Sequence, residues 1–139
     1  MSKFFRLEEL LHSETARRGK FENLPSFEIV DSLKRLAEEI LDPLREEMGC
    51  AVNVSSGFRS KKLNDVVKGA KGSQHMKGEA ADIYCKDNRR LFDTAKRLIE
   101  EGRITVGQLI WEKGNDKAPD WVHISLPNAN HKNDILYLK

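Results

Sequence analysis

Residue types that bind divalent metals occur in two short segments of the chain. The segment Ser73–Asp82 contains His75 and Asp82, and the later segment Asp120–His123 ends on a second histidine. Two imidazoles and one carboxylate match the three protein ligands of a catalytic zinc site, whose fourth position is left to water. Zinc lowers the pKa of its bound water toward about 7 and so makes a nucleophile available at neutral pH. The two segments therefore predict a metal-dependent hydrolase.

Such a hydrolase also needs a general base, which takes a proton from the attacking water and gives it to the leaving group. Asp120, three residues before His123, is the first candidate. Glu112, at the end of an expected strand, is the alternative. The competing interpretation is a surface or capping pair, because a short motif is only a hypothesis until its structural context is known.

The elements that position these residues follow from the spacing of apolar side chains. Apolar residues at steps of three and four from Leu33 to Met48 predict one long amphipathic helix that begins near Pro25. Pro43 should kink or divide it, because proline has no backbone donor. Further helices are expected over 6–11, 61–67 and 88–101, and strands over 51–54, 79–85, 108–112, 121–126 and 134–138. Without regular βαβ alternation, the predicted class is α+β, a mostly antiparallel sheet with flanking helices.

Side-chain alternation in the expected strands indicates where the candidate ligands point. In a strand over 121–126, Val122 and Ile124 share the face opposite His123. The aliphatic side chains belong to the core, so His123 should face a cleft. Asp82 lies in the expected strand over 79–85, and His75 can approach Asp82 from the loop before that strand.

Length and composition limit the class of protein. The chain has 139 residues, 39% hydrophobic and 33% charged, which predicts a single domain over residues 1–139. No apolar run approaches the ~18 residues that a membrane span requires, and residues 1–6 do not begin a secretory signal. We therefore expect a monomer synthesised in the cytoplasm, without membrane insertion. Cys50 and Cys85 are expected to be buried, reduced thiols.

Charge is nearly balanced overall but uneven along the chain. The net charge is +2, yet the stretch from Arg59 to Lys77 carries six bases and one acid. This stretch adjoins the candidate metal site and either attracts an anionic ligand or is an ordinary solvated face. No aromatic-interleaved basic motif accompanies it, so nucleic acid is not an expected partner. His12 and His131, near the ends of the chain, are interpreted as surface residues.

Three blocks of the sequence resemble the signature blocks of the zinc D-alanyl-D-alanine peptidases, a family of carboxypeptidases, dipeptidases and phage L-alanyl-D-glutamate endopeptidases. The blocks are Ser55–Ser60, Ser73–Asp82 and Trp121–His123, and their order and spacing also fit. The opening Phe4–Arg18 is similar to a compact branch often found in phages and prophages. The resemblance implies the fold shared with the Hedgehog signalling domain.

The resemblance also implies roles for individual residues. His75, Asp82 and His123 would be the zinc ligands, Arg59 would contact the substrate and stabilise the developing oxyanion, and Ser73 would hydrogen-bond the substrate. Many carboxypeptidases and dipeptidases of the family carry glutamate where this chain has Asp120. Aspartate there is similar to some phage endopeptidases.

The function implied is hydrolysis of an amide next to a D-amino acid in peptidoglycan stem peptides, with Zn²⁺ as cofactor. An endolysin of this type would act at the cell wall after release from the cytoplasm. A non-catalytic zinc-bearing domain of the same fold, which binds the cell wall without cutting it, is the alternative.

Overall fold

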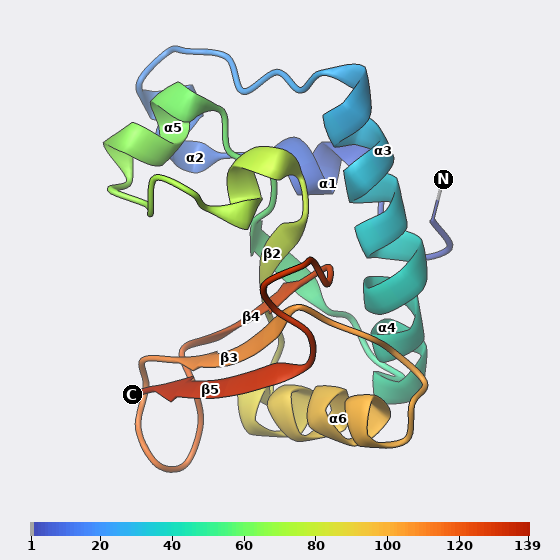
Figure 1. Ribbon diagram of the computed structural model, residues 1–139. Coiled ribbons are helices and arrows are strands. Elements are labelled where there is room, and N and C mark those ends of the chain that lie inside the picture. Colours follow the sequence, from blue (N-terminus) through green and yellow to red (C-terminus); the bar gives the residue numbers. More distant parts are fainter. Residues whose placement is uncertain (1) are drawn as a thin grey trace.

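A five-stranded sheet lies at the centre of the computed structural model, which describes residues 2–139 (Figure 1). The strand order is β1-β2-β4-β3-β5. The strands are β1 Asn53–Ser56, β2 Ala80–Tyr84, β3 Gln108–Glu112, β4 Trp121–Ser125 and β5 Asp134–Leu138. The predicted α+β class is confirmed.

The sheet is mixed, and the expectation of a mostly antiparallel sheet is wrong in this respect. β1 with β2, β2 with β4 and β4 with β3 pair antiparallel, but β5 pairs parallel to β3. β4 ends where β3 begins, because the two strands are antiparallel. The chain then crosses the start of β3, where the Asn133 backbone N–H donates to the Val106 carbonyl. From there β5 runs along the free edge of β3 in the same direction.

The long amphipathic helix is present and is interrupted close to the proline. It consists of α3 Phe27–Leu36, the π-helical turn η1 Ala37–Leu41 and α4 Asp42–Met48. The backbone N–H of Asp42 bonds to the Ala37 carbonyl, five residues back. This wider turn directly precedes Pro43, which explains how the helix continues past a residue without a backbone donor.

The remaining helices cover one face and one end of the sheet. They are α1 Leu7–Leu11, α2 Glu14–Arg18, α5 Lys61–Val66, the 3-10 turn η2 Gln74–Lys77 and α6 Asn88–Glu100. α6 packs against β3, β4 and α4 (Figure 1), and Phe92 meets Trp111 edge to face with ring centroids 5.3 Å apart. Val122 and Ile124 are fully buried in this core, as the alternation of β4 predicted. Within residues 2–139, no helix combines the length and apolar character that crossing a membrane requires.

The turn after α4 differs from the sequence-based expectation. Gly49 adopts a left-handed conformation with φ 67° and ends α4. The strand β1 begins at Asn53, two residues later than the expected start at Ala51. Cys50 lies in this turn and is exposed, and Cys85 is half-buried. The expectation of two buried thiols is therefore wrong.

Gly57 lies in the loop that carries the first signature block, at the point where this loop packs against α1. The next residue, Phe58, donates its backbone N–H to the Leu10 carbonyl at 2.8 Å. Asn23 holds the same loop, because its side-chain amide donates to the carbonyls of Leu11 and Phe58 at 2.9 and 2.8 Å. A Cβ at Gly57 would overlap the Leu10 carbonyl oxygen. This position therefore accepts only glycine without movement of α1.

We expect Gly57→Ala to lower the free energy of unfolding by about 1–3 kcal/mol, the usual cost of overpacking. Gly72→Ala is the matched control, because nothing lies within 4 Å of a Cβ at that position. Urea unfolding of both variants checks this. Equal stability of the two variants would contradict the close packing of α1 against the loop.

Candidate metal centre

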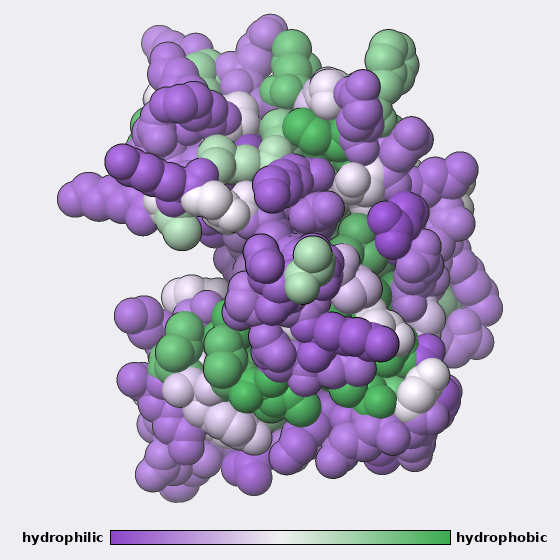
Figure 2. All heavy atoms as spheres, in the orientation of Figure 1, coloured by the Kyte–Doolittle hydropathy of each residue, from purple (hydrophilic) through white to green (hydrophobic). Residues whose placement is uncertain are grey.

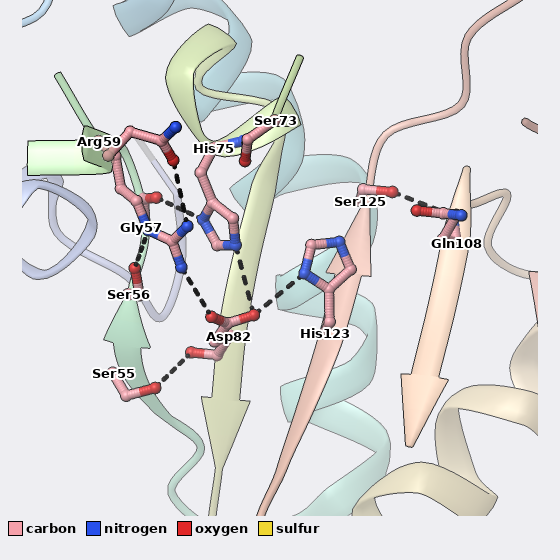
Figure 3. A network of polar contacts seen from close by, with 11 residues as sticks. Ser55, Ser56, Gly57, Arg59, Ser73, His75, Asp82, Gln108, His123 and Ser125 are labelled. Atoms are coloured by element: carbon pink, nitrogen blue, oxygen red, sulfur yellow. Dashed lines mark hydrogen bonds and ion pairs between the residues drawn. The ribbon is translucent and has the colours of Figure 1, made fainter. Parts of the chain in front are cut away.

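His75, Asp82 and His123 converge on one point at the open face of the sheet (Figure 3). Their ligand atoms all lie within 4.8 Å of one another. Asp82 Oδ1 is 3.0 Å from His123 Nδ1 and 3.4 Å from His75 Nε2. β2 and β4 bring Asp82 and His123 together, because these two residues are directly paired in the antiparallel register. The structure thus assembles the three residues that the sequence singled out as ligands.

The backbone fixes the orientation of His75. Its Nδ1 lies 2.7 Å from the Gly57 carbonyl oxygen, so Nδ1 carries the proton and donates it there. Nε2 therefore faces Asp82. It donates to the carboxylate when it carries a proton and offers a lone pair to a metal when it does not. A backbone carbonyl that holds the outer nitrogen of a histidine is a recurrent feature of metal sites, because it sets the tautomer of the ligand. The ring is buried, with 3% of the residue exposed.

Asp82 is a buried carboxylate surrounded by donors. Burial by itself would raise the pKa of Asp82, but hydrogen bonds and charge from His123 and His75 hold it well below its usual range. Arg59 Nη2 approaches the second carboxylate oxygen at 3.4 Å. Asp82 is therefore an anion at neutral pH, and an anionic oxygen is the form that binds a metal.

Arg59 is held in place by neighbours from its own loop and from α5. Its Nε donates to Ser56 Oγ at 3.1 Å, and its Nη1 approaches Asn64 Oδ1 at 3.4 Å. Burial lowers the pKa of Arg59, and the charge of Asp82 partly opposes this. The guanidinium stays charged, since its ordinary pKa exceeds 12. It also lines a groove on the β1 side of the metal centre, together with Ser56 and Tyr84.

A second pocket opens on the other side of the metal centre, next to β3. Its lining includes His123 and Ser73, and Figure 2 shows the surface hollowed between α5 with its following loop and the strands β3 and β5. Glu112 also lines this pocket. It is on the same sheet face as His123, because Glu112 pairs with Trp121 and Ile110 pairs with His123. Burial and the charge of Asp82 raise the pKa of Glu112.

Asp120 does not line this pocket. It directly precedes β4, and alternation places it on the face opposite His123. Its side chain is exposed, and its backbone carbonyl accepts a bond of 2.9 Å from Asn88 at the start of α6. The structure therefore brings Glu112, and not Asp120, to the same pocket as a candidate ligand.

The sequence interpretation missed the residues that follow β4. Asn128, Asn130 and His131 line the same pocket as His123 and Glu112. His131 was interpreted as a surface residue, but its Nδ1 is 2.8 Å from Asp134 Oδ2. The three-residue spacing of His131 and Asp134 was a weak signal for this pair. The position of His131 in this pocket depends on the parallel pairing of β5 with β3.

The chemistry of the donor set fits a zinc ion. Two imidazole nitrogens and one carboxylate oxygen are ligands that zinc accepts, and three such ligands leave one position for water or substrate. The orientation of His75 by Gly57 supports the fit, because it directs Nε2, the nitrogen that a metal would bind, toward Asp82. A donor set of this kind beside an open pocket with a half-buried acid is typical of metal-dependent hydrolases.

Comparison with protein families agrees with this class. The family model described as Peptidase M15 matches residues 3–125. The chain therefore belongs to the Peptidase M15 family, the zinc D-Ala-D-Ala carboxypeptidases and endopeptidases, and is a metallopeptidase by family. A comparison with curated proteins finds no match.

We expect Asp82→Asn to weaken zinc binding by at least about tenfold, in line with a loss of 1.4 kcal/mol or more when an anionic ligand is neutralised. His75→Ala should weaken it similarly. Asp93→Asn is the control, because it makes the same chemical change at an exposed residue of α6, where Asp93 pairs with Arg89. Titration calorimetry with zinc measures the dissociation constants. Because zinc that binds the folded state stabilises it, zinc should also raise the melting temperature of the wild type. Unchanged zinc affinity in both site variants would contradict the assignment.

Proposed function

We propose that the protein is a zinc peptidase that hydrolyses an amide bond next to a D-amino acid in peptidoglycan stem peptides. The observation that carries the proposal is the convergence of His75, Asp82 and His123 beside a pocket that contains Glu112, in a member of Peptidase M15. Bound zinc supplies a polarising positive charge and lowers the pKa of a water. The side chains around it supply proton transfer and substrate binding.

Glu112 is proposed as the general base. It takes a proton from the water that attacks the scissile carbonyl and later gives it to the leaving amine. Its position in the pocket of His123 and its raised pKa support this role over that of Asp120, which lies on the other face. A raised pKa brings a carboxylate closer to the operating pH, which is the direction that favours a general base.

Arg59 and Ser73 are proposed to bind the substrate on the two sides of the metal centre. Arg59 presents a fixed cation beside Asp82, suited to stabilise the negative charge that develops on the carbonyl oxygen. Ser73 lines the pocket on the β3 side, and its Oγ accepts from the His75 backbone N–H at 3.2 Å. Its hydroxyl hydrogen remains available to the substrate.

Several finer features of the proposal rest on the resemblance of the three sequence blocks. We propose the Hedgehog-type fold, a single domain, a monomer, and action at the bacterial cell wall after release. Cleavage between L-alanine and D-glutamate is favoured over removal of a terminal D-alanine, since aspartate at position 120 is similar to phage endopeptidases. A domain that binds the wall without cutting it is the competing function.

Incubation of the zinc-loaded protein with purified peptidoglycan, followed by mass analysis of the muropeptides, tests the proposal. We expect new fragments whose masses identify the cleaved amide, and their loss on chelation of the metal. Binding to peptidoglycan without new fragments would support the competing function.

Glu112→Gln should lower kcat by about 10²–10⁴-fold, the usual contribution of a general base, with zinc still bound. Asp120→Asn provides the comparison, because it makes the same chemical change at the other candidate, and it should retain nearly full activity. Steady-state cleavage of a synthetic stem peptide measures both. Loss of activity in Asp120→Asn with Glu112→Gln active would reassign the base to Asp120.

A further inference from the structure

Residues 126–134 build one wall of the pocket beside the metal centre. This segment follows the region matched by the family model, which ends at residue 125. Asn128, Asn130 and His131 from it line the pocket together with His123 and Glu112. The pocket has a volume of about 320 Å³. Part of the proposed substrate site is thus formed by residues that the family match does not include.

The wall is ordered by a tight turn. Asn128 Oδ1 accepts from the backbone N–H groups of Asn130 and His131, both at 2.8 Å, and the Asn128 N–H donates to the His131 carbonyl at 3.0 Å. The start of the segment is tied to the loop that carries His75, because Gln74 Nε2 donates to the Leu126 carbonyl at 3.0 Å. The turn is therefore formed before any ligand arrives.

These internal bonds determine which polar groups remain for a ligand. The Asn128 oxygen is already occupied twice, so its side chain offers only the NH₂ donor. His131 uses Nδ1 with the Asp134 carboxylate, so this nitrogen is not available to a ligand. Lys77 also lines the pocket, is exposed, and forms no ion pair with any of the described residues 2–139. Beside Glu112, the pocket thus offers a ligand the N–H donors of Asn128 and the cation of Lys77.

We infer that Asn128 and Lys77 recognise a carboxylate of the substrate, and that this part of the pocket determines which stem peptides are cut. The inference rests on the proposed peptidase function and adds the chemistry of the group next to the scissile amide. A carboxylate accepts several hydrogen bonds and gains from a facing cation. The carboxylate is either the C-terminal one of the peptide or that of an internal D-glutamate.

Asn128→Asp changes the group that would bind the substrate and keeps the hydrogen bonds of the turn. The aspartate keeps an oxygen for the two backbone N–H groups of the turn and replaces the NH₂ donor by an anionic oxygen. Asn115→Asp is a matched control, because Asn115 Oδ1 likewise accepts from the backbone N–H groups of Lys117 and Ala118, in a loop that does not line the pocket. Lys77→Met removes the cation of the pocket and leaves the turn unchanged.

The measurements are kcat and KM for cleavage of a stem peptide with all carboxylates free, and dissociation constants of its cleavage products by calorimetry. Two further peptides carry an amide at the C-terminus or at the D-glutamate, which distinguishes the two sources of the carboxylate. We expect Asn128→Asp and Lys77→Met each to raise KM and the product dissociation constant for the free-carboxylate peptide by about tenfold or more, the value of a hydrogen bond to a charged group. The effect should be lost with one of the two amidated peptides, kcat should change little, and Asn115→Asp should behave as the wild type.

Equal changes for the acid and both amidated peptides, or no change in either variant while the wild type cuts, would overturn the inference and leave the peptidase function intact. Absence of cleavage by the wild type would instead refute the proposed function, and the calorimetry would still show whether the pocket selects a carboxylate. Melting temperatures of all variants identify any loss of folding, and Lys77→Met tests the inference even if Asn128→Asp is unstable.

Discussion

The burial of the Asp82 carboxylate is the constraint on which the site depends. A carboxylate with 8% of its residue exposed is costly unless donors surround it, and here they come from three separate parts of the chain. His123 comes from β4, His75 from η2, and Arg59 from the loop after β1. Two of these partners have further contacts: Gly57 O accepts from His75, and Ser56 Oγ accepts from Arg59.

The same arrangement divides the open face of the sheet into two sides. Arg59 faces the groove beside β1, and Glu112 faces the pocket beside β3, with the three ligands between them. A peptide lying across the sheet would pass the fixed cation, the metal centre and the acid in turn. Stabilising negative charge on one side and transferring a proton on the other are the two tasks that amide hydrolysis requires.

The candidate ligands were predictable from the sequence, but their surroundings were only partly so. The motif spacing identified His75, Asp82 and His123, and strand alternation placed His123 on the face away from the core. The same alternation, applied to Asp120, would have placed that residue on the opposite face and favoured Glu112 as the base. The mixed sheet was not predictable, because the parallel pairing of β5 depends on which edge of β3 remains free. The pocket wall at His131 was missed for the same reason.

The central claim is that one zinc ion binds between His75, Asp82 and His123. A crystal of the zinc-loaded protein, with diffraction recorded on both sides of the zinc absorption edge, tests it most directly. We predict a single strong anomalous peak within about 2.0–2.2 Å of one nitrogen from each histidine and one oxygen of Asp82. Absence of a peak at this position, or a peak held by other residues, would contradict the account.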